Sequence, residues 1–343
     1  MRSAPQQALL DRFVGGHPDV PGVLLHMDGP KLQWSGAAGV RDRLTRQPLT
    51  ADATVRIASI TKTYVAAAVL RLRELGKLEL DDPIGSHVGG ELAELLGEER
   101  CRCILIRHLL THMSGLCDFV MDTDYQQVMM ADLHRRWTRE DQVWYALDGC
   151  ADVGEPGEGF HYSDTGYVLL GAVIERATGS GLAASLRSLL RFEALGLTAT
   201  YLESLDPTPA EAGPRACQYV HGQDTHDADP SFDLWGGGGL VASMADVAAF
   251  YRALFDGRVY DHPDTLARML EPATVAEGAQ IGMGIAGRTI AGHLLYGHGG
   301  YWGLYAGYLP DLDAAMSVAV LERDALPVLA EELLPGIVAI AAS

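Results

Sequence analysis

Strand-like segments lie at both ends of this chain, and a long, mostly helical region separates them. Residues 20–40 form two extended runs around an Asp-Gly-Pro turn at 28–30, which is the pattern of a β-hairpin. Residues 293–324 supply two or three further strands, and residues 325–343 form an amphipathic helix. We therefore predict an α/β fold in which both chain ends build one antiparallel sheet flanked by helices.

The middle of the chain shows mostly helical patterns, broken by loops rich in Gly, Pro and Asp. With 343 residues, 48% hydrophobic and 21% charged, the chain is long enough for one large domain or for two that share a core. We predict that residues 1–57 and 271–343 form a discontinuous α/β subdomain. Residues 58–270 are then a mostly helical subdomain inserted against the sheet.

The charge of the chain bears on its partners. The formal net charge is −19, whereas nucleic acids and anionic membrane surfaces require basic patches, so we expect neither as a partner. The N-terminus has no apolar signal core, and no stretch approaches the roughly 18 apolar residues of a membrane span. These features favour a cytoplasmic protein.

The five cysteines are an odd number, and Cys101 and Cys103 are too close in sequence for the usual two-residue spacing of redox or zinc pairs. Free thiols in a reducing compartment are the simplest interpretation.

Ser59 and Lys62 lie three residues apart at the front of an apolar stretch with helical spacing, which Gly76 is placed to end. Only three of the 26 basic residues are lysines, so Lys62 is an unusual choice. Ser59 could simply cap the helix while Lys62 faces solvent. Alternatively, backbone N–H groups at the helix start could stabilise an oxyanion, and a desolvated lysine could lose its proton and activate the serine.

Two other segments carry chemically useful side chains. Tyr162-Ser163-Asp164 lies in a glycine-bounded loop before an apolar helix that starts near Gly166. The segment 298–300 reads His-Gly-Gly, and its glycines would let a ligand approach the strand backbone. Taken alone, Tyr162 is a loop aromatic packed on the core, and the histidine is a hydrogen-bonded strand residue.

Together these segments resemble the serine β-lactamase and penicillin-binding-protein superfamily, in its class C, DD-peptidase and esterase branch, for which Ser-x-x-Lys is a signature. The resemblance covers most of the chain. Five segments carry it, in the order of the family: ASITKTY at 58–64, LIRHLLTHMSGL at 105–116, YSD at 162–164, WGGGGLVASMADVAAF at 235–250 and HGG at 298–300.

The resemblance implies a β-lactamase/transpeptidase-like fold with the active site between the two subdomains. It implies that Ser59 is the acylated nucleophile and Lys62 its proton partner. Tyr162 would be the general base, its ionised form favoured by the nearby ammonium. The backbone N–H groups of Ser59 and Tyr301 would form the oxyanion hole, and His298 would face the substrate.

The resemblance implies that Asp164, His298, Gly299 and Gly300 bind the substrate. The first three of these residues depart from the family pattern. Asp164 replaces the usual asparagine, and an ionised carboxylate can only accept hydrogen bonds. It could bind a cationic substrate group or pair internally with Lys62. Gly299 replaces the threonine of carboxylate-binding relatives, and His298 the lysine of many lactamases. These changes argue against a β-lactamase or DD-carboxypeptidase and favour an esterase, amidase or D-amino-acid-type peptidase.

Other site types are poorly matched. His108 and His112 have the i, i+4 spacing of metal ligands, but the helix lacks the glutamate of His-Glu-x-x-His. The glycine run 236–239 is followed by no Gly-Lys-Ser/Thr, so it is read as a close-packed turn near the active site, and no Gly-x-Ser-x-Gly is present. We therefore expect neither a metal nor a cofactor.

The sequence thus predicts a serine hydrolase of esters or amides, with a small molecule or short peptide as substrate. An acyltransferase that passes the acyl group to an amine or alcohol shares the same chemistry up to the acyl-enzyme. A binding or sensor module without turnover is the third alternative, against which the intact Ser59, Lys62 and Tyr162 speak. Oligomeric state is left open.

Overall fold

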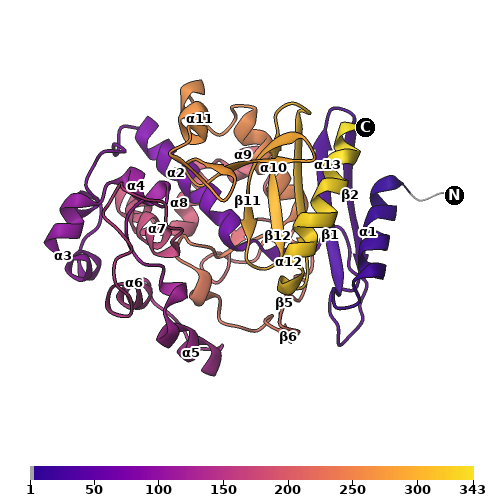
Figure 1. Cartoon of the computed structure of the whole chain (residues 1–343), viewed down its shortest axis with the longest axis horizontal. Coiled ribbons are helices and arrows are strands. Elements are labelled where there is room, and N and C mark those ends of the chain that lie inside the picture. Colours follow the sequence, from indigo (N-terminus) through magenta and orange to yellow (C-terminus); the bar gives the residue numbers. More distant parts are fainter. Residues whose placement is uncertain (1–3) are drawn as a thin grey trace.

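The computed structural model describes residues 4–343 and places a large antiparallel sheet beside a group of helices (Figure 1). The sheet has eight strands in the order β2-β1-β13-β12-β11-β10-β9-β8, so strands from the two chain ends pair directly. The predicted fold class is therefore confirmed. The strands are β1 (Gly22–Gly29), β2 (Leu32–Gly39), β8 (Thr274–Ala276), β9 (Ala279–Ile281), β10 (Ala286–Ile290), β11 (His293–Gly300), β12 (Leu304–Leu309) and β13 (Ala314–Val320).

Two smaller sheets lie outside the large one. The first has the order β3-β7-β4, and the second is the pair β5-β6. Their strands are β3 (Thr54–Arg56), β4 (Tyr201–Leu202), β5 (Tyr219–Val220), β6 (Gln223–Asp224) and β7 (Leu240–Ser243). Because β3 leads directly into the segment of Ser59, the first small sheet anchors that segment.

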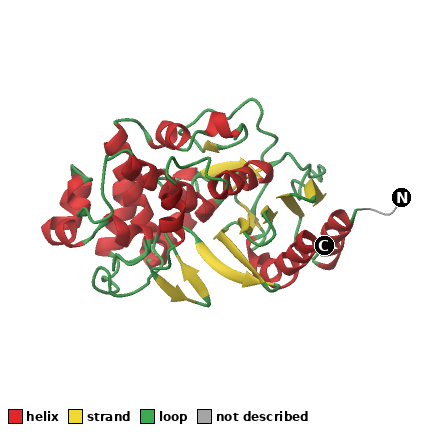
Figure 2. Ribbon diagram, turned by 90° about the horizontal axis from the view of Figure 1, so that it is seen from above, coloured by secondary structure: helices red, strands yellow, loops and turns green. Residues whose placement is uncertain are grey.

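The helices divide into those that cover the sheet and those that gather beside it (Figures 1 and 2). Helices α3 to α8 lie on the side of the molecule away from α1 and α13. The helices are α1 (Pro5–Gly16), α2 (Thr61–Glu74), α3 (Glu91–Cys103), α4 (Ile106–Leu110), α5 (Thr123–Ala131), α6 (Arg139–Asp148), α7 (Asp164–Thr178), α8 (Leu182–Leu189), α9 (Phe192–Leu195), α10 (Met244–Phe255), α11 (Pro263–Leu270), α12 (Leu326–Val328) and α13 (Leu334–Ala342).

The large sheet is covered on both faces, as the alternation of side chains along β1 shows. Val23 and Leu25 join the core that also contains residues of α1 and α13, whereas Leu24 joins the main core with α10 and α2. Helices α1 and α13 therefore lie on one outer face of the sheet (Figure 2), and Ala58 and Ile60, on either side of Ser59, belong to the main core.

Helix α2 is the central helix of the main core. Twelve of its 14 residues are buried, and it packs against α7 and α8. It ends at Glu74, two residues before Gly76, whose φ of 66° suits a glycine and marks the predicted stop. Ser59 precedes α2 on the short 3₁₀ helix η1 (Ala58–Ile60), so it lies at the buried end of this helix.

Several elements differ from the prediction. The hairpin at residues 22–39 and three strands after 293 are present, but α1 was not predicted, and α7 begins at Asp164 rather than near Gly166. An 18-residue window within Arg323–Ala342 has a mean hydropathy of 1.7, so this segment is long and apolar enough to span a membrane, and the expectation that no stretch approaches this was wrong. In the structure, apolar side chains of this segment such as Ile337 and Val338 are buried under the sheet.

The cysteine prediction was also wrong in part. Cys117 and Cys150 form a disulfide, whereas Cys101, Cys103 and Cys217 are free. The spacing of 33 residues gave no pairing signal, because the pairing depends on how the intervening loop and α5 and α6 fold. Since disulfides persist in oxidising compartments, the cysteines no longer support a cytoplasmic location, which stays a prediction.

Candidate active site

Ser59 is held where the first small sheet, helix α2 and strand β11 meet. The residue before it, Ala58, has a φ of 46°, a conformation that costs an L-residue energy and that fixes the direction of the serine. A Cβ at Gly300 would lie 2.6 Å from the carbonyl oxygen of Ile57. Glycine is therefore required at position 300, where β11 meets the serine segment; the expected approach of a ligand to residues 299–300 stays a prediction.

Lys62 lies on the first turn of α2 and is 0% exposed. Its Nζ donates hydrogen bonds to Ser59 Oγ at 2.8 Å and to the carbonyl oxygen of Gly237 at 2.6 Å. It also lies 2.5 Å from Asp164 Oδ1, an ion pair whose angles are not those of a hydrogen bond. The structure thus brings the predicted lysine and serine together, and it gives Asp164 the internal partner considered above.

The charge state of Lys62 differs from the expectation. Burial lowers the pKa of its ammonium, but the charges of Asp164 and Tyr162 outweigh burial and raise the pKa above the ordinary value. The prediction that desolvation would make the lysine lose its proton more readily was therefore wrong, because desolvation does not act alone. At neutral pH Lys62 is an ammonium.

Tyr162 lies beside the same ammonium, with Lys62 Nζ 5.1 Å from the centre of its ring. Burial raises the pKa of the phenol, and Asp164 raises it further, while the contacts with Lys62 and Ser59 lower it; the net direction is upward. The ring is still 40% exposed, so the phenol borders the solvent-accessible side of the site. The expected ionised form of Tyr162 is thus not the resting form, because one ammonium does not offset burial and a nearby carboxylate.

Two further carboxyl groups face this cluster and were not predicted. Burial and the charge of Asp164 raise the pKa of Asp118 to about 8 and that of Asp233 to about 7, although Lys62 lowers both. Asp118 lies two residues after one of the family-like segments, and Asp233 two residues before another, which is the only sequence signal for them. Asp118 and Asp233 thus lie close enough to Lys62 and Asp164 for those charges to shift their pKa values, and Arg56 also lowers the pKa of Asp233.

The glycine run 236–239 is part of the site. Its residue Gly237 accepts the hydrogen bond from Lys62, and a Cβ there would lie 3.5 Å from Asp164 Cβ. Gly236 and Gly239 have φ values of 120° and 97°, which side chains disfavour. The run is the close-packed turn that the sequence predicted, with one carbonyl pointing at the lysine.

His298 lies on β11, and its Nδ1 is 2.6 Å from the carbonyl oxygen of Gly299. Because a carbonyl oxygen can only accept, Nδ1 carries the proton. Burial, and next the charge of Lys62, lower the pKa of the imidazole to about 4, so the ring is neutral and Nε2 is an acceptor. The ring centre is 6.2 Å from that of Tyr162, which places His298 across the site.

The two N–H groups of the predicted oxyanion hole lie at the junction of η1 and β11. Within residues 4–343, neither the Ser59 N–H nor the Tyr301 N–H donates a hydrogen bond to another residue. Tyr301 follows the last residue of β11, Gly300, which contacts the backbone before Ser59. Free donors at this junction are what an oxyanion hole requires.

The histidines with metal-like spacing bind separate partners. His108 Nδ1 accepts from the Leu105 N–H, and His112 Nδ1 accepts from the Ser163 N–H, 51 positions away. In the described part of the chain no group of three or more His, Cys, Asp or Glu side chains could hold a metal ion. The spacing reflects two structural hydrogen bonds.

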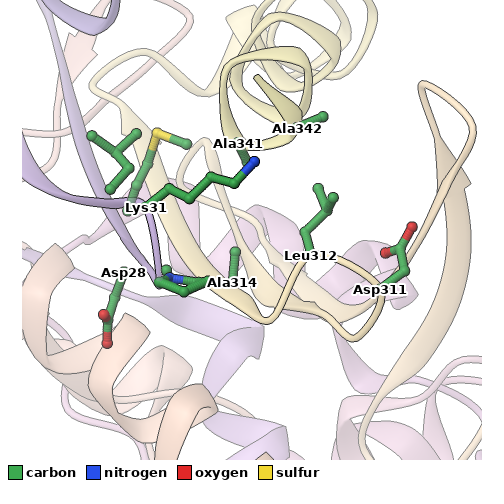
Figure 3. Close-up of a pocket in the computed structure, with 11 residues that line it drawn as sticks. Asp28, Lys31, Asp311, Leu312, Ala314, Ala341 and Ala342 are labelled. Atoms are coloured by element: carbon green, nitrogen blue, oxygen red, sulfur yellow. The ribbon is translucent and has the colours of Figure 1, made fainter.

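A cavity of about 150 Å³ lies elsewhere, between the β1–β2 turn, the β12–β13 turn and α13 (Figure 3). None of its lining residues belongs to the cluster around Ser59. Figure 3 shows the Lys31 side chain extended toward the last turn of α13 near Ala341, where a cation is favoured by the helix dipole. This cavity therefore has a structural explanation.

Comparisons with known proteins agree with the geometry. Esterase EstB of Burkholderia gladioli is 35% identical over 181 residues, which are 52% of this chain and 45% of that protein. Penicillin-binding protein 4* of Bacillus subtilis (strain 168) is 28% identical over 208 residues, 60% of this chain and 42% of that protein. The chain thus spans less than half the length of these curated relatives.

Two solved structures cover the chain almost completely. The D-amino acid amidase of Ochrobactrum anthropi SV3, complexed with L-phenylalanine amide, has a TM-score of 0.83, is 27% identical and covers 98% of both chains. A D-stereospecific amidohydrolase from Streptomyces sp. has a TM-score of 0.81, is 25% identical and covers 97% of this chain and 99% of that one. A profile of the family described as Beta-lactamase matches residues 10–331, and the chain therefore belongs to the beta-lactamase family.

Proposed function

We propose that this protein is a serine hydrolase that cleaves esters or amides through an acyl-Ser59 intermediate. The observation that carries the proposal is the 2.8 Å hydrogen bond from the buried Lys62 Nζ to Ser59 Oγ. The backbone N–H groups of Ser59 and Tyr301 donate to no other residue in the described chain, so both are free to act as oxyanion donors. A nucleophile, a proton partner and oxyanion donors are thus present together.

The protonation states set the order of the proton transfers. In the resting site Lys62 and Tyr162 are protonated, and the carboxyl group of Asp164 lies 2.5 Å from Lys62 Nζ. Once the two groups turn into hydrogen-bond geometry, Lys62 passes a proton to Asp164, and the neutral amine that remains accepts the Ser59 proton as Oγ attacks the substrate carbonyl.

The leaving group then needs a proton. The phenol of Tyr162 donates its proton to the departing amine or alkoxide and recovers one from Lys62, so all protons are conserved. Water attacks the acyl-Ser59 carbonyl by the same route in reverse and releases the acid. In this proposal Tyr162 acts first as the acid and not as the base.

The substrate is a small molecule, and we propose a substrate with a free amino group. Asp164 offsets the charge of Lys62 at 2.5 Å, and a cationic substrate group would in addition favour the ionised forms of Asp118 and Asp233, whose pKa values of about 8 and about 7 lie near neutral pH. The neutral His298 adds an acceptor and no positive charge. The likeness to a D-amino acid amidase over 98% of both chains supports amides or esters of D-amino acids as the substrate class.

The test uses four small substrates and one labelling probe. D-phenylalanine amide should be hydrolysed faster than L-phenylalanine amide and faster than N-acetyl-D-phenylalanine amide, which lacks the charge. p-Nitrophenyl acetate has neither a chiral centre nor an amino group, so it reports the acylation of Ser59 alone. A fluorophosphonate should add one mass to Ser59, and Ser59→Ala should abolish both labelling and turnover.

Each part of the proposal can fail separately. Labelling of another serine, or unchanged turnover in Ser59→Ala, would overturn the acyl-enzyme. Equal rates for free and acetylated amides would overturn the amino-group preference. If an added amine takes up more of the acyl group than water does, the protein is an acyltransferase.

A further inference from the structure

His112 is a buried titratable residue that has no role in the mechanism above. Its imidazole is stacked on the phenol ring of Tyr162, with ring centres 4.3 Å apart and planes 25° apart. The residue is only 5% exposed. A flat ring therefore lies directly behind the proposed proton donor.

The imidazole itself is held on its other sides. Tyr167 of α7 lies 5.0 Å away, tilted by 33°, and Phe160 makes an edge contact at 5.9 Å. The Tyr167 hydroxyl donates to the Leu110 carbonyl oxygen at 2.8 Å, so this support is itself fixed to the chain before His112. The ring cannot turn without moving α7 or the loop.

The same imidazole also holds the backbone next to Tyr162. The Ser163 N–H donates to His112 Nδ1 at 3.2 Å in a buried setting. Nδ1 must be unprotonated to accept, and burial, followed by the charge of Lys62, lowers the pKa of His112 well below its ordinary range. The acceptor is therefore present throughout neutral pH.

We propose that His112 is a positioning residue, which directs the Tyr162 phenol toward Ser59 and Lys62 by a stacked ring and by a hydrogen bond from the Ser163 backbone. This inference rests on the proposed function, since it concerns the same phenol. A neutral imidazole is the side chain that supplies both a flat ring and an acceptor at the δ position. Phenylalanine would supply the ring alone, and asparagine the acceptor alone.

The backbone of His112 limits which variants are informative. Its φ is 55°, a region in which Asn and His are several-fold enriched over other residues with side chains. His112→Asn is therefore compatible with the backbone and keeps the acceptor. His112→Phe keeps the stacking ring, and His112→Ala removes both features.

The experiment measures kcat and KM for D-phenylalanine amide, whose amine leaving group needs the phenol proton, and the rate at which a fluorophosphonate labels Ser59. His112→Ala should lower kcat roughly 10²-fold, the usual scale for a misplaced reacting group, with KM within about threefold. His112→Asn and His112→Phe should each recover part of that loss. His108→Ala, which removes the other histidine of the same segment and its hydrogen bond from the Leu105 N–H, is the matched control and should stay within about threefold of wild type.

A double-mutant cycle with Tyr162→Phe separates positioning from a general loss of structure. Because His112 acts through the phenol oxygen, His112→Ala should cost little more in the Tyr162→Phe background. Equal losses in both backgrounds, or wild-type rates in all three His112 variants, would overturn the inference. Turnover that survives Ser59→Ala would instead show that the hydrolase proposal has failed.

Discussion

Lys62 Nζ lies 2.5 Å from Asp164 Oδ1, so the lysine that contacts the nucleophile is also paired with a carboxylate. The same nitrogen donates to Ser59 Oγ at 2.8 Å. The pair holds a proton at the nucleophile and supplies, in the carboxylate, the nearest group that can take it away. This relationship makes the replacement of the family asparagine by Asp164 a change in proton handling as well as in charge.

Asp164→Asn nearly conserves shape and removes this partner. We expect kcat on charged and neutral substrates to fall together by roughly 10-fold or more, the scale of a lost charge-assisted interaction. The pH profile of kcat should move toward acid. Asp164 raises the pKa of Lys62, so without this carboxylate the ammonium loses its proton at lower pH. Rates from pH 5 to 10 on D-phenylalanine amide and p-nitrophenyl acetate check both points. A loss confined to the cationic substrate would assign Asp164 to substrate binding instead.

Tyr162→Phe removes one oxygen and leaves the ring that contacts His112. We expect kcat/KM to fall by at least about 10², the usual scale for a general acid or base, and Lys62→Ala to do the same. The midpoint of thermal unfolding of Tyr162→Phe should stay near wild type, because the phenol borders solvent. Near-wild-type rates in both variants would mean that other groups move the protons.

Local geometry explains which parts of the site could be predicted from the sequence. Ser59 and Lys62 lie three residues apart, so their contact follows from helical spacing alone. Tyr162 and His298 meet only through the tertiary fold, and the family resemblance was the only guide to them. Asp118 was missed because its raised pKa arises from burial, which no local pattern encodes.

The same limit applies to the fold. The sheet from both chain ends was predicted, because alternating strand patterns and turn residues are local signals. The pairing of Cys117 with Cys150 was missed, since it depends on the path of the chain between them. The pKa shift of Lys62 was predicted in the wrong direction. The sequence indicates the apolar surroundings of this lysine but not its distance to Asp164.

The disulfide Cys117–Cys150 supports the loop that carries the site. The Cys117 carbonyl oxygen accepts from Ser163 Oγ at 3.2 Å and from Thr165 Oγ1 at 2.8 Å, on either side of Asp164. Cys150→Ser should therefore destabilise the protein by about 2–4 kcal/mol, the typical effect of a native disulfide. Thermal unfolding with and without dithiothreitol checks this, and Cys101→Ser is the free-thiol control. An unchanged midpoint in Cys150→Ser would contradict the structural role.

Asp118→Asn should make stability less sensitive to pH. The pKa of Asp118 is 3.8 ordinarily and about 8 in the fold, so the folded state holds a proton that the unfolded state has lost. The free energy of unfolding of the wild-type protein therefore falls as pH rises from about 4 to 8. The Asp118→Asn variant lacks this contribution, because an amide does not titrate. Between pH 5 and 8 the unfolding midpoint of Asp118→Asn should therefore rise relative to that of the wild type. Above pH 8 the difference between the two midpoints should stay constant. A constant difference across this range would show that Asp118 is ionised in the fold.

Gly299→Thr should restore part of the carboxylate recognition that this chain lacks. A Cβ at Gly299 would lie 3.7 Å from the Leu304 carbonyl oxygen and 3.8 Å from Tyr305 Cδ2, so a side chain fits on β11 without displacing its neighbours. Threonine also favours strands. Its hydroxyl should raise the rate at which benzylpenicillin acylates Ser59 by roughly 10-fold or more, as expected for one hydrogen bond to a charged group. Intact mass against time measures this rate. Gly299→Val has the same shape without the hydroxyl and should not gain, so equal behaviour of the two variants would contradict the role of Gly299 in excluding β-lactams.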